Sequence, residues 1–270
     1  GLTTGVEAPL PNDCYGVELG YVVETFKQSN AYADQVIAAA DAGFSNEYLY
    51  SDTHLSNRLK TVAKFISGGL QTKVFVLKLP GFDTHAEQVV AGSPTTGWHA
   101  ELIKTLSDAI YAFQQDLRLL GLQERVLGMT FSEFGRKIKS NAGVGTDHGT
   151  AAPMIVFGDC VRAGIIGANP EIAEEVDIEE GVAMQYDFKS IYGSVLMDWF
   201  EVSEEKIQEL LTEDFTYMPI VGACASVNTY EPVILSSVNA FPNPFNNNFS
   251  LDFSIEQKKW VKIDLSDVMG

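Results

Sequence analysis

Three short apolar runs, each beside a cluster of polar residues, constrain the fold of this chain more than any other feature. The runs at 74–79, 126–130 and 153–158 have the length and the branched or aromatic side chains of buried strands. Segments of helical periodicity separate the first two runs and follow the third. Strands that alternate with helices predict a mostly parallel sheet with helices on both faces. We therefore expect an α/β domain.

The polar clusters carry acidic and imidazole side chains. Asp83 and His85 follow the first run, Glu133 follows the second, and Asp147 and His148 precede the third. Ligands of such sheets bind beyond the carboxyl ends of the strands, so we expect these side chains to converge at one edge. Imidazole and carboxylate groups bind divalent metal ions, and five of them are enough for one complete site or two incomplete ones. The alternative is that each cluster is a polar surface loop.

Four helices are predicted from apolar stripes of helical period. They cover 55–66, 102–120, 188–199 and 203–211. Glycines follow the first two helices, and Asp187 is a candidate N-cap of the third.

The charge and the cysteines exclude several classes of protein. A net charge of −18 argues against binding to nucleic acid or to an anionic membrane surface, because both need basic patches. No run reaches the roughly 20 apolar residues of a membrane span.

The chain has no initiator methionine and no signal-peptide pattern, so we expect a longer precursor. Cys14, Cys160 and Cys224 form no metal spacing and no disulfide framework, and we expect Cys160 to be a buried thiol.

The composition changes near residue 220. The stretch at 221–232 consists mainly of small and polar residues, Ala, Ser and Asn among them, and lacks helical periodicity, which predicts a linker. Residues 233–270 contain two segments in which apolar and polar residues alternate. We therefore expect an α/β domain at 1–220, a linker at 221–232 and a partial β-sandwich at 233–270.

The three polar clusters resemble the motifs of DUF1501, an uncharacterised bacterial family placed with the alkaline-phosphatase-like and sulfatase-like fold. The resemblance covers 55–220 and rests on Gly81–His85 with Gln88, on Met129–Arg136 and on Gly145–Pro153. It implies a metal-dependent hydrolase that acts on phosphate or sulfate esters.

The resemblance also implies a cofactor and site residues. A divalent ion (Zn, Ca, Mn or Mg) would be held by Asp83, His85, Glu133, Asp147 and His148. Arg136 would bind the anionic group of the ester, or would instead form a structural ion pair with Glu133.

The expected nucleophile is not found. Enzymes of this fold place an Asp and a Ser, Thr or modified Cys at the end of their first strand. Residues 1–50 contain nothing equivalent, and the sulfatase Cys/Ser-x-Pro-x-Arg motif is absent. Either the nucleophile and its strand lie upstream of Gly1, or this copy has lost them.

The last segment resembles the C-terminal sorting domain of type IX secretion substrates in Bacteroidetes. The resemblance rests on Phe241–Phe245, on the alternating strand after it, and on Val261–Gly270. It implies export across the outer membrane, with the type IX translocon and outer-membrane shuttle proteins as partners.

Two functions are compatible with these features. The first is a secreted or cell-surface, metal-dependent hydrolase of small phosphate or sulfate esters. The alternative is a catalytically degenerate surface protein that serves binding or adhesion and is carried as type IX cargo. Neither function involves nucleic acid or a membrane span.

Overall fold

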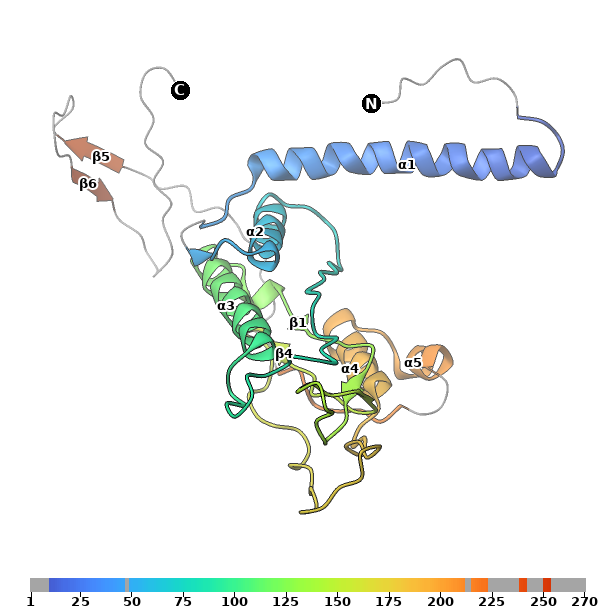
Figure 1. Cartoon of the computed structure of the whole chain (residues 1–270). Coiled ribbons are helices and arrows are strands. Elements are labelled where there is room, and N and C mark those ends of the chain that lie inside the picture. Colours follow the sequence, from blue (N-terminus) through green and yellow to red (C-terminus); the bar gives the residue numbers. More distant parts are fainter. Residues whose placement is uncertain (1–9, 47–48, 212–214, 223–237, 242–249, 254–270) are drawn as a thin grey trace. The chain divides into compact units, whose positions relative to one another are not determined.

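The computed structural model describes residues 10–46, 49–211 and 215–222, and two further strands at 238–241 and 250–253. Figure 1 shows the elements along the chain. The helices are α1 (Cys14–Ala42), α2 (His54–Ser67), α3 (Trp98–Leu119), the 3₁₀ helix η2 (Gln123–Arg125), α4 (Phe188–Phe200) and α5 (Glu204–Leu211). The strands are β1 (Gly128–Met129), β2 (Gly135–Arg136), β3 (His148–Gly149), β4 (Val156–Phe157), β5 (Val238–Phe241) and β6 (Ser250–Phe253).

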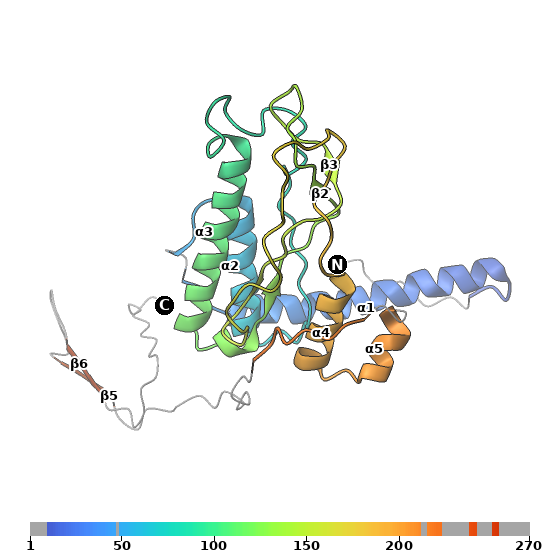
Figure 2. The ribbon, with the colours of Figure 1, turned by 90° about the horizontal axis from the view of Figure 1, so that it is seen from below.

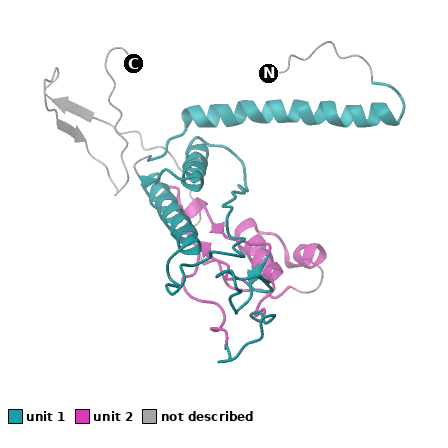
Figure 3. Cartoon of the chain, in the orientation of Figure 1, with its two compact units in different colours: residues 1–120, 134–151, 172–182 teal, residues 121–133, 152–171, 183–270 magenta. Residues whose placement is uncertain are grey.

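The chain forms two compact units from interleaved segments (Figure 3). The first unit contains α1, α2, α3, β2 and β3, and the second contains β1, β4, α4 and α5. In residue numbers, the first unit is 1–120, 134–151 and 172–182, and the second is 121–133, 152–171 and 183–270. The linker expected at 221–232 lies outside the described residues from residue 223 onward.

Helix α1 was not predicted, because its apolar residues do not form one stripe. The helix begins at Asp13, whose carboxylate accepts a hydrogen bond from the N–H of Gly16 at 2.8 Å. Its last turn lies against the end of α2, where a Cβ atom on Gly68 would lie 1.9 Å from the carbonyl oxygen of Ala39. Only a glycine permits this close approach. None of the described helices combines the length and apolar character that a membrane span requires.

Helices α2 and α3 form the core of the first unit and lie side by side (Figure 2). Both were predicted, and the apolar stripes that predicted them are the buried faces. The buried side chains include Leu55, Leu59, Val62, Leu102, Ala109, Phe113 and Leu117.

Asp116 is a buried carboxylate on α3 that holds the segment before α2. Its side chain is fully buried and accepts hydrogen bonds from the hydroxyls of Ser45 and Tyr50, at 2.6 and 2.8 Å. The backbone and side-chain amides of Asn46 donate to its other oxygen, at 3.0 and 2.7 Å. A buried carboxylate with four donors is satisfied without a cationic partner.

The second unit packs α4 and α5 around Ile207, which is fully buried. Helix α4 begins at Asp187, as predicted, where the carboxylate accepts from the N–H of Lys189 at 2.8 Å. Two buried serines of α4 bind the segment at 215–222. Ser190 accepts from a backbone N–H there at 3.1 Å, and Ser194 accepts from another at 2.8 Å.

The strands pair in three two-stranded antiparallel sheets, β1–β4, β2–β3 and β5–β6. The described part of the chain contains no parallel pair, so the expected parallel α/β sheet stays a prediction. The first of the runs expected as strands, at 74–79, has no strand pairing in the described residues, and Val74 and Val76 are 64% and 71% exposed. In the tail, β6 lies in the first of the two alternating segments, β5 was not predicted, and the second alternating segment lies outside the described residues, so the partial β-sandwich stays a prediction.

Cys160 is disulfide-bonded, which corrects the expectation of a free core thiol. Its side chain is buried, as expected, and Cys14 is a free, exposed thiol. The spacing of three distant cysteines did not indicate the bond, because bonding depends on which Cα atoms the fold brings together.

Candidate metal centre

Two loops of the first unit, at 82–88 and 141–149, carry the candidate ligands and are joined through their backbones. The N–H groups of Glu87 and Gln88 donate to two carbonyl oxygens of the second loop, at 2.9 and 3.1 Å. Gly145 lies so close to the first loop that a Cβ atom on it would be 2.3 Å from a carbonyl carbon. Any larger residue at this position would push the two loops apart.

The side chain of Gln88 also joins the loops. Its Oε1 accepts hydrogen bonds from the hydroxyls of Thr84 and Thr146, at 2.9 and 2.7 Å. An amide oxygen has two lone pairs, so both hydroxyl groups are satisfied by one acceptor. These bonds fix the spacing of the loops directly beside the candidate ligands.

Three side-chain atoms from these loops form a compact triangle. Oδ1 of Asp83 lies 2.8 Å from Nε2 of His148 and 3.1 Å from Nε2 of His85, and the two Nε2 atoms are 3.2 Å apart. Ligand atoms that are each about 2.1 Å from one ion lie about 3 Å apart, so the triangle matches one face of a metal site. The three side chains are about half exposed, at 60, 50 and 46% for Asp83, His85 and His148. The site is therefore open to further ligands.

Asp147 fixes the orientation of His85. Its Oδ1 lies 2.8 Å from Nδ1 of His85. Asn141 donates to the same carboxylate oxygen at 3.2 Å and to the backbone carbonyl of His85 at 2.8 Å. Because an ionised carboxylate can only accept, Nδ1 of a neutral His85 carries the hydrogen, and Nε2 presents its lone pair to the triangle. Carboxylate–histidine pairs of this kind orient metal-binding imidazoles and make them stronger ligands.

Both carboxylates of the site are held in the charged form. The hydrogen bond with His148 lowers the pKa of Asp83, and the charge of Arg136 acts in the same direction. The hydrogen bonds with His85 and Asn141 lower the pKa of Asp147. Two carboxylates that stay charged beside two imidazoles give a site that favours a cation.

His148 is positioned by a strand pair and by an aromatic ring. It pairs with Arg136 across the β2–β3 sheet. The ring of Phe134, which directly precedes β2, stacks on the imidazole with the centroids 3.6 Å apart and the planes at 14°. Because Phe134 covers one face of the His148 imidazole, Nε2 of His148 is held toward Asp83.

Arg136 binds both loops that carry the ligands. Its guanidinium donates to the carbonyl oxygen of Phe82, to that of Thr146 at 2.6 Å, and to Oδ1 of Asp83 at 3.3 Å. The Arg136 side chain is only 19% exposed. Its expected contact with a substrate anion stays a prediction, whereas its role in holding the two loops is visible.

The structure brings together three of the five predicted ligands, Asp83, His85 and His148. Asp147 lies on the outer nitrogen of His85 rather than in the triangle. Glu133 belongs to the second unit, and its ligand role stays a prediction.

The sequence analysis missed Asn141 and gave no role to Gln88 or Phe134. Gln88 and Phe134 belong to the motifs that carry the family resemblance, and this was the only sign in the sequence that they could have a role. Asn141 has no such signal, because its function depends on contacts with residues distant in the sequence.

The comparisons with known proteins identify a family but no characterised relative. The family model described as "Protein of unknown function (DUF1501)" matches residues 28–208, which is more than half of the chain and includes both ligand loops. No curated protein and no solved structure matches the chain.

Proposed function

The chain belongs to the DUF1501 family, whose function is unknown, and we propose that it is a metal-dependent hydrolase of small phosphate or sulfate esters. The observation that carries the proposal is the triangle formed by Oδ1 of Asp83 and the Nε2 atoms of His85 and His148. A divalent ion held there would polarise an ester oxygen and lower the pKa of a bound water toward about 7.

The donor set favours particular metals. Two imidazole nitrogens with one carboxylate oxygen suit Zn²⁺ or Mn²⁺. Ca²⁺ and Mg²⁺ prefer ligand sets made of oxygen atoms. Of the four ions expected from the sequence, we therefore propose Zn²⁺ or Mn²⁺.

Two threonines that neighbour the candidate ligands in the sequence have hydroxyl groups that are engaged in structural bonds. Thr84 lies between two of the ligands, and Thr146 lies beside Asp147, but both hydroxyls donate to Gln88. Neither is placed to act as the covalent nucleophile of the alkaline-phosphatase-like enzymes. We propose instead that water attacks the ester directly. The charge of Arg136, next to Asp83, supports the proposed binding of an anionic substrate.

The second part of the proposal is export by the type IX secretion system to the cell surface or the medium. Two observations support it. The β5–β6 pair agrees with a β-rich tail, and the disulfide at Cys160 is typical of proteins that leave the reducing cytoplasm.

The test is the metal dependence of ester hydrolysis by the purified full chain. The chain is stripped of metal with a chelator, Zn²⁺ or Mn²⁺ is restored, and hydrolysis of p-nitrophenyl phosphate and p-nitrophenyl sulfate is followed. We expect restored turnover in the wild type and a loss of about 100-fold or more in His148→Ala. The control is His54→Ala, which removes an exposed histidine at the start of α2.

Two results would contradict the proposed hydrolase. Unchanged turnover in His148→Ala would separate the activity from the triangle. Full metal occupancy without turnover of any ester would favour the alternative, a surface protein that serves binding or adhesion.

A further inference from the structure

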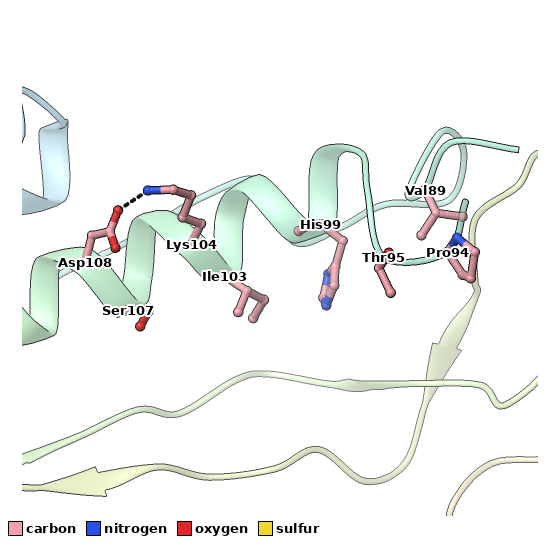
Figure 4. Close-up of a pocket in the computed structure, with 9 residues that line it drawn as sticks. Val89, Pro94, Thr95, His99, Ile103, Lys104, Ser107 and Asp108 are labelled. Carbon is pink, nitrogen blue, oxygen red and sulfur yellow. Dashed lines mark hydrogen bonds and ion pairs between the residues drawn. The ribbon is translucent and has the colours of Figure 1, made fainter. Parts of the chain in front are cut away.

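The first turn of α3 holds the end of the first ligand loop, at 82–88. The backbone N–H groups in the first turn of a helix have no partner within the helix. The N–H of His99 is one of them, and it donates to the carbonyl oxygen of Gln88 at 3.0 Å. Figure 4, a close-up of the cavity beside α3, shows His99 in this turn and Val89, the residue after Gln88, on the segment that precedes the helix. The helix therefore fixes one end of the loop through its own backbone.

Trp98, the first residue of α3, holds the other end of the loop. Its indole N–H donates to the carbonyl oxygen of Gly81 at 3.0 Å. Gly81 has a φ of +109°, which favours glycine, and a Cβ atom on it would lie 3.3 Å from the side chain of Leu102. Leu102 lies one turn after Trp98 and is buried in the core. The loop therefore begins at a point that is held against a helix of the core.

The contacts with α3 lie close to Asp83, the carboxylate of the triangle. Phe82, the residue between Gly81 and Asp83, contacts the ring of His99 edge to face, with the centroids 5.8 Å apart. The N–H of Thr84 donates to the carbonyl oxygen of Phe82 at 2.9 Å, which closes a turn around Asp83. A shift of Gly81 is therefore passed to Asp83 through a short segment that is itself bonded.

The backbone matters more for Asp83 than for the other two groups of the triangle. The two imidazoles are oriented by Asp147 and Phe134. The carboxylate of Asp83 has a weaker support of this kind, because the bond from Arg136 to its Oδ1 is 3.3 Å long. Its place therefore depends on the backbone before it, which is held at Gly81.

We propose that Trp98 is a positioning residue of the metal centre, which acts on Asp83 through the carbonyl group of Gly81. An indole N–H is a donor only, so Trp98 is not itself a ligand. The inference rests on the proposed metal site and adds a residue that the proposed function does not use. Because coupling between two sites is reciprocal, the bond to Gly81 strengthens metal binding, and bound metal strengthens that bond.

The first test removes the donor and keeps the shape of the side chain. In the full chain, Trp98 is replaced by β-(3-benzothienyl)alanine, which has sulfur in place of the indole N–H. The affinity for Zn²⁺ is measured by competition with a chromophoric chelator. We expect it to fall by about 2- to 10-fold, which is the range for one hydrogen bond. The control is the same replacement of Trp199 on α4, in the second unit, which should leave the affinity unchanged.

The second test asks whether the bond responds to the metal, which a purely structural contact would not do. The indole N–H signals of the ¹⁵N-labelled full chain are followed by NMR while Zn²⁺ is added. The signal of Trp98 is assigned by its absence in Trp98→Phe. We expect this signal to shift until the site is saturated, and to stay in place in Asp83→Ala.

Three results would overturn the inference while the proposed metal site stands. They are an unchanged Zn²⁺ affinity without the Trp98 donor, an equal loss of affinity in the Trp199 control, and a Trp98 signal that ignores Zn²⁺ in a wild type that binds it. A wild type that binds no Zn²⁺ would instead remove the proposed metal site, and the inference with it. The wild-type titration alone distinguishes the two kinds of failure.

Discussion

At the residue scale, the structure distinguishes the carboxylate that lies in the candidate triangle from the carboxylate that orients one of its imidazoles. Asp83 belongs to the triangle. Asp147 lies outside the triangle and contacts Nδ1 of His85, the nitrogen that faces away from it. We expect Asp147→Ala to weaken Zn²⁺ binding by about 10- to 100-fold, because His85 would lose the partner that fixes its tautomer. The measurement is a competition titration with a chromophoric chelator, and Asp34→Ala on the exposed surface of α1 is the control.

Two outcomes would contradict this assignment. An unchanged affinity in Asp147→Ala would mean that the orienting bond is unimportant. A complete loss of binding, as expected for Asp83→Ala, would make Asp147 a ligand, as the sequence analysis proposed.

The residues of the triangle could be predicted from the sequence, but their supporting contacts could not. Asp83, His85 and His148 have side chains whose chemistry suits metal binding whatever their surroundings. Asn141 acquires its role only because the fold places it next to Asp147. A side chain that works through another group leaves no signal in the pattern of a single sequence.

At the element scale, the contact between Tyr50 and the buried Asp116 should make the stability of the first unit decrease at alkaline pH. Burial raises the pKa of the Tyr50 hydroxyl, and the nearby charge of Asp116 raises it further. An unfolded tyrosine ionises near pH 10. The stability that depends on neutral Tyr50 is therefore complete below about pH 10 and decreases as the pH rises above that value.

Replacement of Tyr50 by Phe tests this dependence. We expect Tyr50→Phe to lower the free energy of unfolding at pH 7 by about 1 kcal/mol, because one hydrogen bond to Asp116 is lost. Above pH 10, its stability should decline less steeply than that of the wild type. Urea unfolding at pH 7 to 11 measures both effects, with the exposed Tyr111→Phe as the control. Parallel declines in the wild type and Tyr50→Phe would show that Tyr50 does not cause the dependence.

Amphipathic helices were the elements that the sequence predicted well. The apolar stripes of α2 and α3 gave their positions, because each helix buries one face against the other. Helix α1 buries only Gly16 and Ala39, so no stripe marks it. The run at 74–79 has the composition of a strand, but composition does not identify a pairing partner, and no strand pairs with this run among the described residues.

At the scale of the whole molecule, the proposed export signal can be tested apart from the metal centre. We expect deletion of Phe241 onward to prevent delivery to the cell surface and to the medium, because the proposed secretion partners bind this tail. Cell fractionation and immunodetection in the producing bacterium measure the distribution of the protein. The matched control is the full-length His148→Ala variant, which should be exported normally. Normal surface levels of the truncated protein would exclude the sorting role.

The interleaving of the two compact units could not be predicted from the sequence. After residue 120, successive segments of the chain belong alternately to the second and the first unit. These segments are 121–133, 134–151, 152–171, 172–182 and 183–270. A pattern in the sequence is local, whereas this interleaving arises from contacts between distant segments. The two loops of the candidate metal centre could still be located, because each contains its own candidate ligands.

The central claim is that two imidazoles and one carboxylate from two loops bind one divalent ion. The most direct measurement is X-ray absorption spectroscopy of the full chain loaded with Zn²⁺. The structure predicts a zinc spectrum with two imidazole nitrogens and additional oxygen ligands at about 2.0–2.2 Å, and one imidazole fewer in His148→Ala. A zinc environment without imidazole, or one that is unchanged in His148→Ala, would contradict the claim.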